Sequence, residues 1–220
     1  MSNQSVFYYR KNFLNKNDLK LLKEWLSTKL FVSGEIANKK KIPRKQIWFQ
    51  EQGHYFNSMW KQRHDRWKGH YYDNFLMNLQ NKIQFEIENN DYLNRTIFRD
   101  CLIYPRINSC LINKYNNEND TISAHKDSPT SFGLTPIVVI LSVGDTRTLK
   151  LKKVKYDKKN PLSCKLDLNN QEMNKDFELE ENSIFIMGGN SQIDFTHQID
   201  KENKKKETRY SLTFRKFLVN

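Results

Sequence analysis

The sequence predicts a mixed α+β protein made mainly of β-strands, with helices near its amino end and a β-sandwich or jelly roll in its second half. Two stretches before residue 90 carry leucine and isoleucine at helical spacing. From Pro136 onward, short apolar runs alternate with turns, which is typical of sandwiches and jelly rolls. A chain of 220 residues is long enough to bury a substantial core as one domain.

The amino end predicts one strand followed by one helix. Residues 6–9 are apolar or aromatic and predict a short strand. Asn17 is the expected N-cap of a helix that continues to about Leu30. The leucines that recur at helical spacing along it are Leu19, Leu22, Leu26 and Leu30. This amphipathic pattern predicts a scaffold helix that packs on a sheet.

A basic loop and an aromatic segment follow this helix. Residues 34–45 are polar and basic, and they lead into an expected strand over 46–50. Between Arg44 and Tyr72, aromatic residues are interleaved with cations, a composition that binds unstacked bases through stacking and phosphate contact. The alternative is an aromatic core beneath solvated lysines. The candidate substrate-binding residues of this segment are Arg44, Lys45, Trp48 and Tyr55.

Residues 75–88 predict a second amphipathic helix. Its apolar face consists of Leu76, Leu79, Ile83 and Ile87. Residues 92–105 are expected to form an irregular connector, and 107–115 a strand. The chain is therefore divided into residues 1–105, which hold the helices and a substrate-recognition segment, and 106–220, the β-rich catalytic core. We expect the two parts to form one integrated domain.

The second half of the chain predicts a series of short strands. They are expected at 137–143, 148–155, 164–168, 177–179, 183–187, 192–197 and 209–217. Gly188, Gly189 and Asn190 predict a turn between two of them.

A His-x-Asp pair is the first candidate for metal binding. In an extended strand His125 and Asp127 project to the same side, about 6–7 Å apart along the backbone. With His197 as a third ligand they make a two-histidine, one-carboxylate triad, which leaves three positions free on Fe(II). A His-x-Asp pair alone is common, and a turn after a strand is the alternative reading.

The last predicted strand carries two arginines on one face. Arg209, Ser211, Thr213 and Arg215 alternate with residues that point to the opposite side. Burying two guanidinium groups is costly unless anions meet them, and bidentate pairing with carboxylates is the usual solution. A dicarboxylate cosubstrate supplies such anions.

These motifs together resemble the AlkB family of Fe(II)/2-oxoglutarate dioxygenases, the oxidative nucleic-acid demethylases, and in particular its DNA-repair branch. The matching residues are Asn113-x-Tyr115, His125-x-Asp127, His197 and Arg209-x-Ser211-x-Thr213-x-Arg215. The chain departs from the family at Ser211, where the family usually has asparagine. Pro43-Arg44-Lys45-Gln46 also resembles a segment that precedes the nucleotide-recognition strands of that branch.

The resemblance implies a double-stranded β-helix core and a set of residue roles. Fe(II) is expected on His125, Asp127 and His197. The residues expected to hold 2-oxoglutarate are Asn113, Tyr115, Arg209, Ser211 and Arg215. We expect Arg209 to be the main anchor and Arg215 to lie toward the iron as a further catalytic residue. Ser128 follows the metal aspartate where the repair branch often has an acidic residue, and is a candidate for substrate binding.

The implied reaction is oxidative removal of N-alkyl groups from nucleic-acid bases. It consumes dioxygen and 2-oxoglutarate and releases formaldehyde, succinate and carbon dioxide. The alternative is a protein hydroxylase or demethylase that uses the same iron chemistry, because the triad reports the oxidant rather than the target. A catalytically inactive binding module is a further alternative, which the complete ligand set argues against.

The composition of the chain limits which binding partners and which cellular compartment are expected. A formal charge of +12 and a pI near 9.5 favour a polyanionic partner such as DNA or RNA, although abundant lysine and asparagine also suit an AT-rich coding genome. Cys101, Cys110 and Cys164 lack CxxC spacing, which indicates a reducing compartment. The sequence has no signal-peptide pattern and no run approaching about 18 apolar residues. We expect a soluble monomer of the cytoplasm or nucleus that does not bind membranes.

Overall fold

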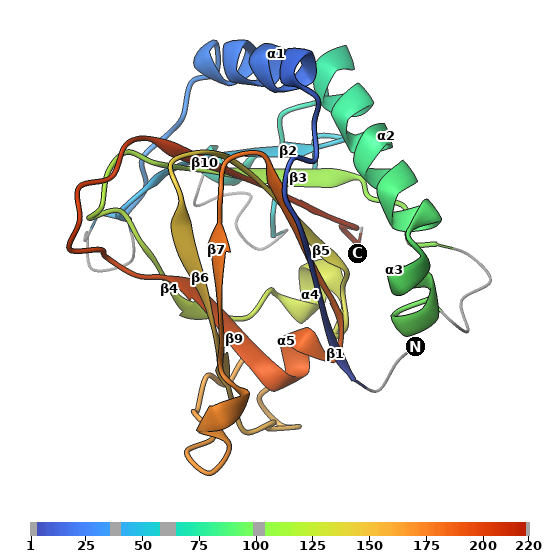
Figure 1. Cartoon of the computed structure of the whole chain (residues 1–220), viewed down its shortest axis with the longest axis vertical. Coiled ribbons are helices and arrows are strands. Elements are labelled where there is room, and N and C mark those ends of the chain that lie inside the picture. Colours follow the sequence, from blue (N-terminus) through green and yellow to red (C-terminus); the bar gives the residue numbers. More distant parts are fainter. Residues whose placement is uncertain (1–3, 36–40, 58–64, 99–103, 219–220) are drawn as a thin grey trace.

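The computed structural model describes residues 4–35, 41–57, 65–98 and 104–218. The strands of this part of the chain form two antiparallel sheets (Figure 1). The major sheet has the order β1 (Ser5–Arg10), β8 (Ser183–Gly189), β5 (Val138–Gly144), β10 (Arg209–Arg215), β3 (Ser109–Tyr115) and β2 (Lys45–Gln50). The minor sheet has the order β4 (Ile122–His125), β9 (Phe195–Ile199), β6 (Arg147–Lys153) and β7 (Lys175–Leu179). The mixed, strand-rich class predicted from the sequence is confirmed.

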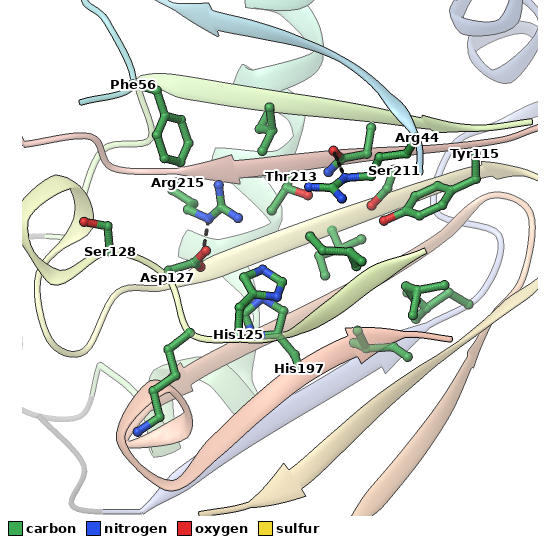
Figure 2. Close-up of a pocket in the computed structure, with 18 of the residues that line it drawn as sticks. Arg44, Phe56, Tyr115, His125, Asp127, Ser128, His197, Ser211, Thr213 and Arg215 are labelled. Atoms are coloured by element: carbon green, nitrogen blue, oxygen red, sulfur yellow. Dashed lines mark hydrogen bonds and ion pairs between the residues drawn. The ribbon is translucent and has the colours of Figure 1, made fainter. Parts of the chain in front are cut away.

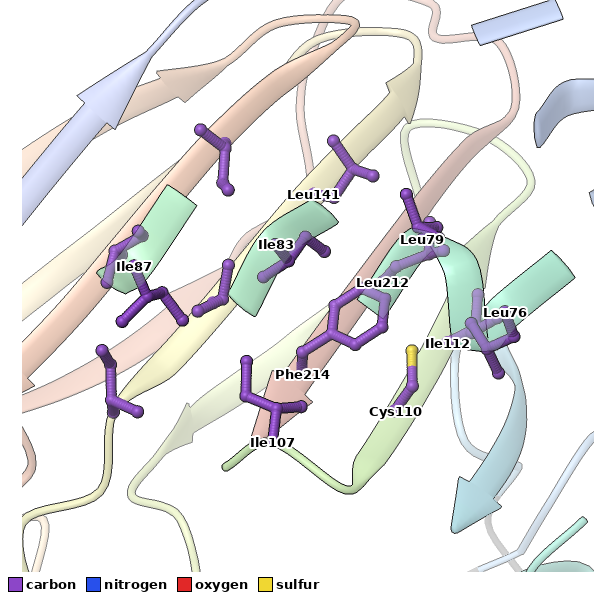
Figure 3. Close-up of a cluster of buried hydrophobic side chains, with 14 of the residues drawn as sticks. Leu76, Leu79, Ile83, Ile87, Ile107, Cys110, Ile112, Leu141, Leu212 and Phe214 are labelled. Carbon is purple, nitrogen blue, oxygen red and sulfur yellow. The ribbon is translucent and has the colours of Figure 1, made fainter. Parts of the chain in front are cut away.

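Two helices cover the outer face of the major sheet (Figure 1). They are α1 (Lys16–Ser27) and α2 (Asn74–Asn89). Figure 3 shows the apolar face of α2 pointing onto the sheet, where its side chains meet Ile112, Leu212 and Phe214. All four predicted apolar residues of α2 are buried, and Ile83 and Ile87 are 0% exposed. The second predicted helix is therefore confirmed, together with the face that it buries.

The first helix begins and ends earlier than predicted. Its N-cap is Asn15 rather than Asn17, and the Asn15 side chain accepts a hydrogen bond from the Asp18 backbone N–H at 2.9 Å. Asn182 fixes this start, because its side chain accepts from the Leu14 backbone N–H at 2.8 Å and holds the preceding residues extended. Helix α1 ends at Ser27, so Leu30 lies beyond it and is 86% exposed.

Three other elements differ from the sequence prediction. The expected connector contains a short helix, α3 (Asp91–Thr96), whose Leu93 is fully buried. Residues 191–194 form a helical turn, α5 (Ser191–Asp194), so the strand that carries His197 starts at Phe195. The strand predicted over 164–168 does not form, and Leu166 makes only an isolated bridge to Val154. Residues 154–174 instead leave the minor sheet as a long loop, which we call the β6–β7 excursion.

The two sheets pack against each other through an apolar cluster between them. It includes Val138, Ile140 and Phe185 of the major sheet and Leu149 and Leu151 of the minor sheet. Toward β10 and β3 the space between the sheets remains open and forms a cavity. Among the helices of the described residues, none has the length and apolar character required to cross a lipid bilayer.

Candidate active site

A cavity of about 370 Å³ lies between the two sheets (Figure 2). Strand β10 lines it with four side chains, and β3, β4 and β9 add others. The sequence-predicted residues that line it are Arg44, Asn113, Tyr115, His125, Asp127, Ser128, His197, Arg209, Ser211 and Arg215. Residues separated by up to 171 positions in the sequence therefore meet at one site.

The three predicted metal ligands come together at this cavity. Strands β4 and β9 pair His125 directly with His197, and their ring centroids are 4.1 Å apart. Asp127 follows two residues later, where β4 has ended. One ligand atom from each of the three residues lies within 4.8 Å of the others, the compact arrangement that one metal ion requires. Among the described residues, His125, Asp127 and His197 are the group of three potential metal ligands that lies this close together.

Both histidines are held neutral. The pKa of His197 is well below its usual value because the ring is buried, and because His125 and Arg215 are nearby. Burial also lowers the pKa of His125, although Asp127 partly offsets this effect. The Ser123 carbonyl lies 2.8 Å from His125 Nδ1, and a carbonyl only accepts hydrogen bonds. Nδ1 therefore carries the proton, and Nε2 is left with a lone pair for a metal.

Asp127 is oriented by two residues from distant parts of the chain. Arg215 Nε donates to Asp127 Oδ2 at 2.9 Å (Figure 2). Gln192 Nε2 donates to the same oxygen at 3.2 Å, and Gln192 Oε1 accepts from the Asp127 backbone N–H at 3.0 Å. Sequence reasoning missed Gln192, which it placed in a strand. The Arg215 contact lies at the metal end of the cavity, where we expected it.

Arg209 lies at the opposite end of β10 and points two nitrogen atoms at the cavity without partners. Its Nε donates to Ser142 Oγ at 2.9 Å, and its guanidinium lies 5.4 Å from the centre of the Tyr115 ring. Nη1 and Nη2 are buried and have no hydrogen-bond partner among the described residues. Burial lowers the pKa of Arg209 to about 10. A guanidinium in this state is prepared to bind a carboxylate.

Arg44 belongs to this end of the cavity as well, although the sequence suggested only substrate contact for it. Its Nε donates to Asn113 Oδ1 at 2.9 Å, and its Nη1 donates to the Thr121 carbonyl at 3.2 Å. Burial lowers its pKa. Arg147, which the sequence analysis did not single out, is also buried and lies 5.6 Å from the Tyr115 ring centre. Arg44 and Arg209 therefore place two cations at the cavity end around Tyr115, whereas Arg147 is paired with Glu202 at 3.0 Å and does not line the cavity.

Comparison with known proteins identifies the family. The model of the 2OG-Fe(II) oxygenase superfamily matches residues 6–215, nearly the whole chain. The chain belongs to this superfamily. Human "Alpha-ketoglutarate-dependent dioxygenase alkB homolog 3" is 38% identical over 108 residues, which are 49% of this chain and 36% of that protein. "DNA oxidative demethylase ALKBH2" of Arabidopsis thaliana is 31% identical over 118 residues, 50% of this chain and 38% of that protein.

This oxygenase therefore resembles the AlkB group, as the motifs indicated. The matched stretch covers little more than a third of the length of each of these curated relatives. Among solved structures, "The structure of OsALKBH1" covers 95% of this chain and 97% of its own, with a TM-score of 0.63 and 17% identity. A prolyl hydroxylase from Trichoplax adhaerens covers 96% of this chain and 83% of its own, with a TM-score of 0.55 and 13% identity. At these identities the likeness concerns the fold.

The residues of the cavity fit the two cofactors of the superfamily, Fe(II) and 2-oxoglutarate. Two neutral imidazoles and one carboxylate are the ligand set of non-haem Fe(II) oxygenases. At the other end, the two partnerless nitrogen atoms of Arg209 match the two oxygens of a carboxylate. Ser211 and Thr213 lie on β10 between these two ends and line the cavity.

The substrate side of this oxygenase differs from the sequence prediction in one residue above all. Trp48 was expected to stack on a base, but it is 0% exposed. Its ring packs edge-on against Phe56 at 4.9 Å and Phe217 at 5.7 Å, and its Nε1 donates to the His54 carbonyl. Trp48 is paired with the cavity residue Leu111 across β2 and β3, but Phe56, Phe132 and Phe217 pack around its ring, so the prediction of base stacking is wrong.

The other substrate candidates have different surroundings. Lys45 is exposed at the start of β2, and Tyr55 packs against the aromatic cluster of Trp48 without lining the cavity. Ser128 lines the cavity and hydrogen-bonds Thr130 at 2.8 Å. From the same segment, Phe56, Asn57 and Trp67 also line the cavity, although they were not among the substrate-binding candidates. Positions 58–64 of the aromatic segment lie outside the described residues.

Proposed function

We propose that this oxygenase removes alkyl groups from nitrogen atoms of nucleic-acid bases. The observation that carries the proposal is the form of the cavity, in which the triad shares one space with the aromatic rings of Phe56 and Trp67. A flat base requires an apolar ring to stack on and a position close to the iron. The relatives reported above, an alkB homolog and a DNA oxidative demethylase, support the same substrate class by their names.

The proposal gives each end of the cavity a role. His125, Asp127 and His197 hold Fe(II), with His125 binding through Nε2. Arg209 binds the distal carboxylate of 2-oxoglutarate through Nη1 and Nη2, as the lack of other partners for these atoms supports. With dioxygen, bound Fe(II) and 2-oxoglutarate would supply the chemistry that hydroxylates an N-methyl group, with 2-oxoglutarate converted to succinate and carbon dioxide. The hydroxymethyl product would then break at its C–N bond, leaving N–H on the base and releasing formaldehyde.

Other residues of the chain position these groups. Arg215 and Gln192 fix the Asp127 carboxylate, so that its second oxygen is aimed at the metal. Asn113, Tyr115 and Ser211 surround the cosubstrate, and Arg44 acts through its hydrogen bond to Asn113. Placing reactants within van der Waals contact of the oxidant is the main contribution of such a site to the rate.

The substrate enters on the side of Phe56, Trp67 and Ser128. The two rings provide the stacking surface, and Ser128 with Asn57 offers polar groups to the base edge. Lys45 and the formal charge of +12 attract the phosphate backbone. A protein hydroxylase is the alternative function, and the strong positive charge and the aromatic wall favour nucleic acid over a peptide.

Two measurements test the proposal. An anaerobic titration of Fe(II) into protein with 2-oxoglutarate should develop the visible charge-transfer band of the chelated cosubstrate. Formaldehyde release should then follow from oligonucleotides that carry N-methylated bases, and neither unmethylated oligonucleotides nor the Asp127→Ala variant should support it. Turnover on a peptide library without turnover on any methylated oligonucleotide would contradict the proposal.

A further inference from the structure

The β6–β7 excursion, residues 154–174, folds back on itself beside the active site. Its two arms are joined by backbone hydrogen bonds, from Lys155 N–H to the Lys165 carbonyl and from Asp167 N–H to the Lys153 carbonyl, both at 3.0 Å. The tip between them includes Pro161 and Leu162. These bonds make the excursion a defined structural element rather than a loose loop.

Leu162 extends the tip of the excursion into the wall of the cavity. It lines the same space as the metal triad, Phe56 and Trp67. The side chain nevertheless remains 48% exposed, so it leaves apolar surface uncovered at the cavity. An apolar side chain in this position gains free energy when a bound molecule covers it.

Lys126 holds the tip of the excursion in this place. It lies in the sequence between two metal ligands, and only 6% of it is exposed. Its ammonium group donates to the Pro161 carbonyl at 3.3 Å and to the Ile193 carbonyl at 3.1 Å. One side chain thus joins the segment that carries His125 and Asp127, the tip of the excursion and helix α5. A buried ammonium keeps such partners because leaving it unbonded is costly.

We infer that the β6–β7 excursion is a substrate-selecting wall of this active site. Leu162 packs against the alkylated base that enters the cavity, and Lys126 is the positioning residue that keeps Leu162 in contact with it. The inference rests on the proposed function, and it assigns a role to a segment that contains none of the recognised motifs. It predicts that changes in the excursion alter the choice of substrate while the cosubstrate end is unaffected.

The first test compares Leu162→Ala with Leu168→Ala in the same excursion. Leu168 is 71% exposed and does not line the cavity, so it is a matched control. Removing an apolar contact with the base should raise the KM for a methylated oligonucleotide about tenfold in Leu162→Ala, as found for small losses of apolar contact. The KM for 2-oxoglutarate should stay at the wild-type value, and Leu168→Ala should match the wild type in both constants.

The second test measures the tether without any substrate. Hydrogen exchange of the Lys155 and Asp167 amides should be about tenfold faster in Lys126→Met than in the wild type, because the excursion opens more often. Lys126→Arg, which keeps the donors and the charge, should restore much of the protection. Lys165→Met, an exposed lysine of the excursion, is the matched control and should exchange like the wild type.

The outcomes separate the inference from the proposed function. If the wild type demethylates oligonucleotides and Leu162→Ala behaves like Leu168→Ala, the inference is wrong and the proposed function stands. Unchanged exchange in Lys126→Met also overturns the role of the tether. If the wild type acts on no methylated oligonucleotide, the proposed function fails first, and the contact between Leu162 and a base fails with it.

Discussion

At the scale of single residues, Arg209 has the most direct consequence for cosubstrate binding. Its two terminal nitrogens are buried and have no hydrogen-bond partner within the described part of the chain, so a carboxylate that meets them would supply one. Arg209→Met keeps most of the volume and removes the charge. We expect it to raise the dissociation constant for 2-oxoglutarate at least tenfold, since truncating a buried charge-assisted pair costs about 2–5 kcal/mol.

Isothermal titration of the Mn(II)-loaded protein with 2-oxoglutarate measures this change. The control is Arg106→Met, because the Arg106 side chain is 71% exposed and lies outside the cavity lining. If Arg209→Met binds 2-oxoglutarate as tightly as the wild type, another cation binds the carboxylate of the cosubstrate. Arg44, which hydrogen-bonds Asn113, is then the first candidate.

Gln192 provides a second prediction at this scale. It hydrogen-bonds both the backbone and the carboxylate of Asp127, so Gln192→Ala should loosen the ligand without removing it. Loss of such an outer partner typically lowers metal affinity about 10- to 100-fold. A Mn(II) titration followed by electron paramagnetic resonance measures the effect. Gln198→Ala is the control, because Gln198 lies on β9, hydrogen-bonds Asp200 and is outside the cavity lining, and it should leave the affinity unchanged.

Residue roles were predictable from the sequence where they depend on local spacing. Alternation along a strand aligned Arg209 with Arg215, and the short separation of His125 and Asp127 in the sequence kept these two close although β4 ends at His125. Gln192 acts on a residue 65 positions away, and no local pattern marks it. Trp48 was misassigned because aromatic residues beside cations have the same pattern in a packed cluster as in a stacking surface. The rings of Phe56, Phe132 and Phe217, which pack around Trp48 and bury it, decide between them.

At the scale of elements, α2 packs its apolar face against the major sheet and stabilises it. Ile83 is fully buried against the sheet, and Ile83→Ala leaves a cavity there. We expect it to lower the free energy of unfolding by about 2–5 kcal/mol. Phe85 on the same helix is 67% exposed, so Phe85→Ala should change stability by no more than about 0.5 kcal/mol. Urea unfolding followed by circular dichroism compares the two variants, and similar losses would contradict the assigned face.

Elements were predictable where apolar periodicity is long, as in α2 and in most strands of the second half. The ends of elements, and segments that do not follow their local pattern, could not be predicted. Asn15 and Asn17 are equally suitable caps in sequence, and the contact of Asn182 with Leu14 selects the first. The leucines of the β6–β7 excursion alternate as in a strand, but they remain largely exposed because the excursion pairs with itself rather than with a sheet.

At the scale of the whole molecule, the positive charge should govern encounter with nucleic acid. The logarithm of the association constant should fall linearly with the logarithm of salt concentration, by about 0.7 for each phosphate contact on a single strand. Lys45→Gln should make this slope less steep by about 0.7, the equivalent of one phosphate contact, because Lys45 is exposed next to the cavity residue Arg44. Lys20→Gln, on the outer helix α1 with a side chain 75% exposed, is the control.

Fluorescence anisotropy across a salt series measures these slopes. Equal slopes for Lys45→Gln and the wild type would remove Lys45 from the nucleic-acid interface. The composition predicted a polyanionic partner, but the net charge does not show where on the molecule that partner binds. Only the fold shows which cations lie at the cavity and which cover the outer helices.

Strand β10 has a consequence for how the active site is assembled. It lies inside the major sheet between β5 and β3, and its one inward face carries both Arg209, the proposed cosubstrate anchor, and Arg215, which hydrogen-bonds Asp127. Sliding β10 by one residue would turn Tyr210, Leu212 and Phe214 inward and all four polar side chains outward. Arg209 and the residue that orients Asp127 are thus lost or gained together, whereas the three candidate metal ligands lie on other segments.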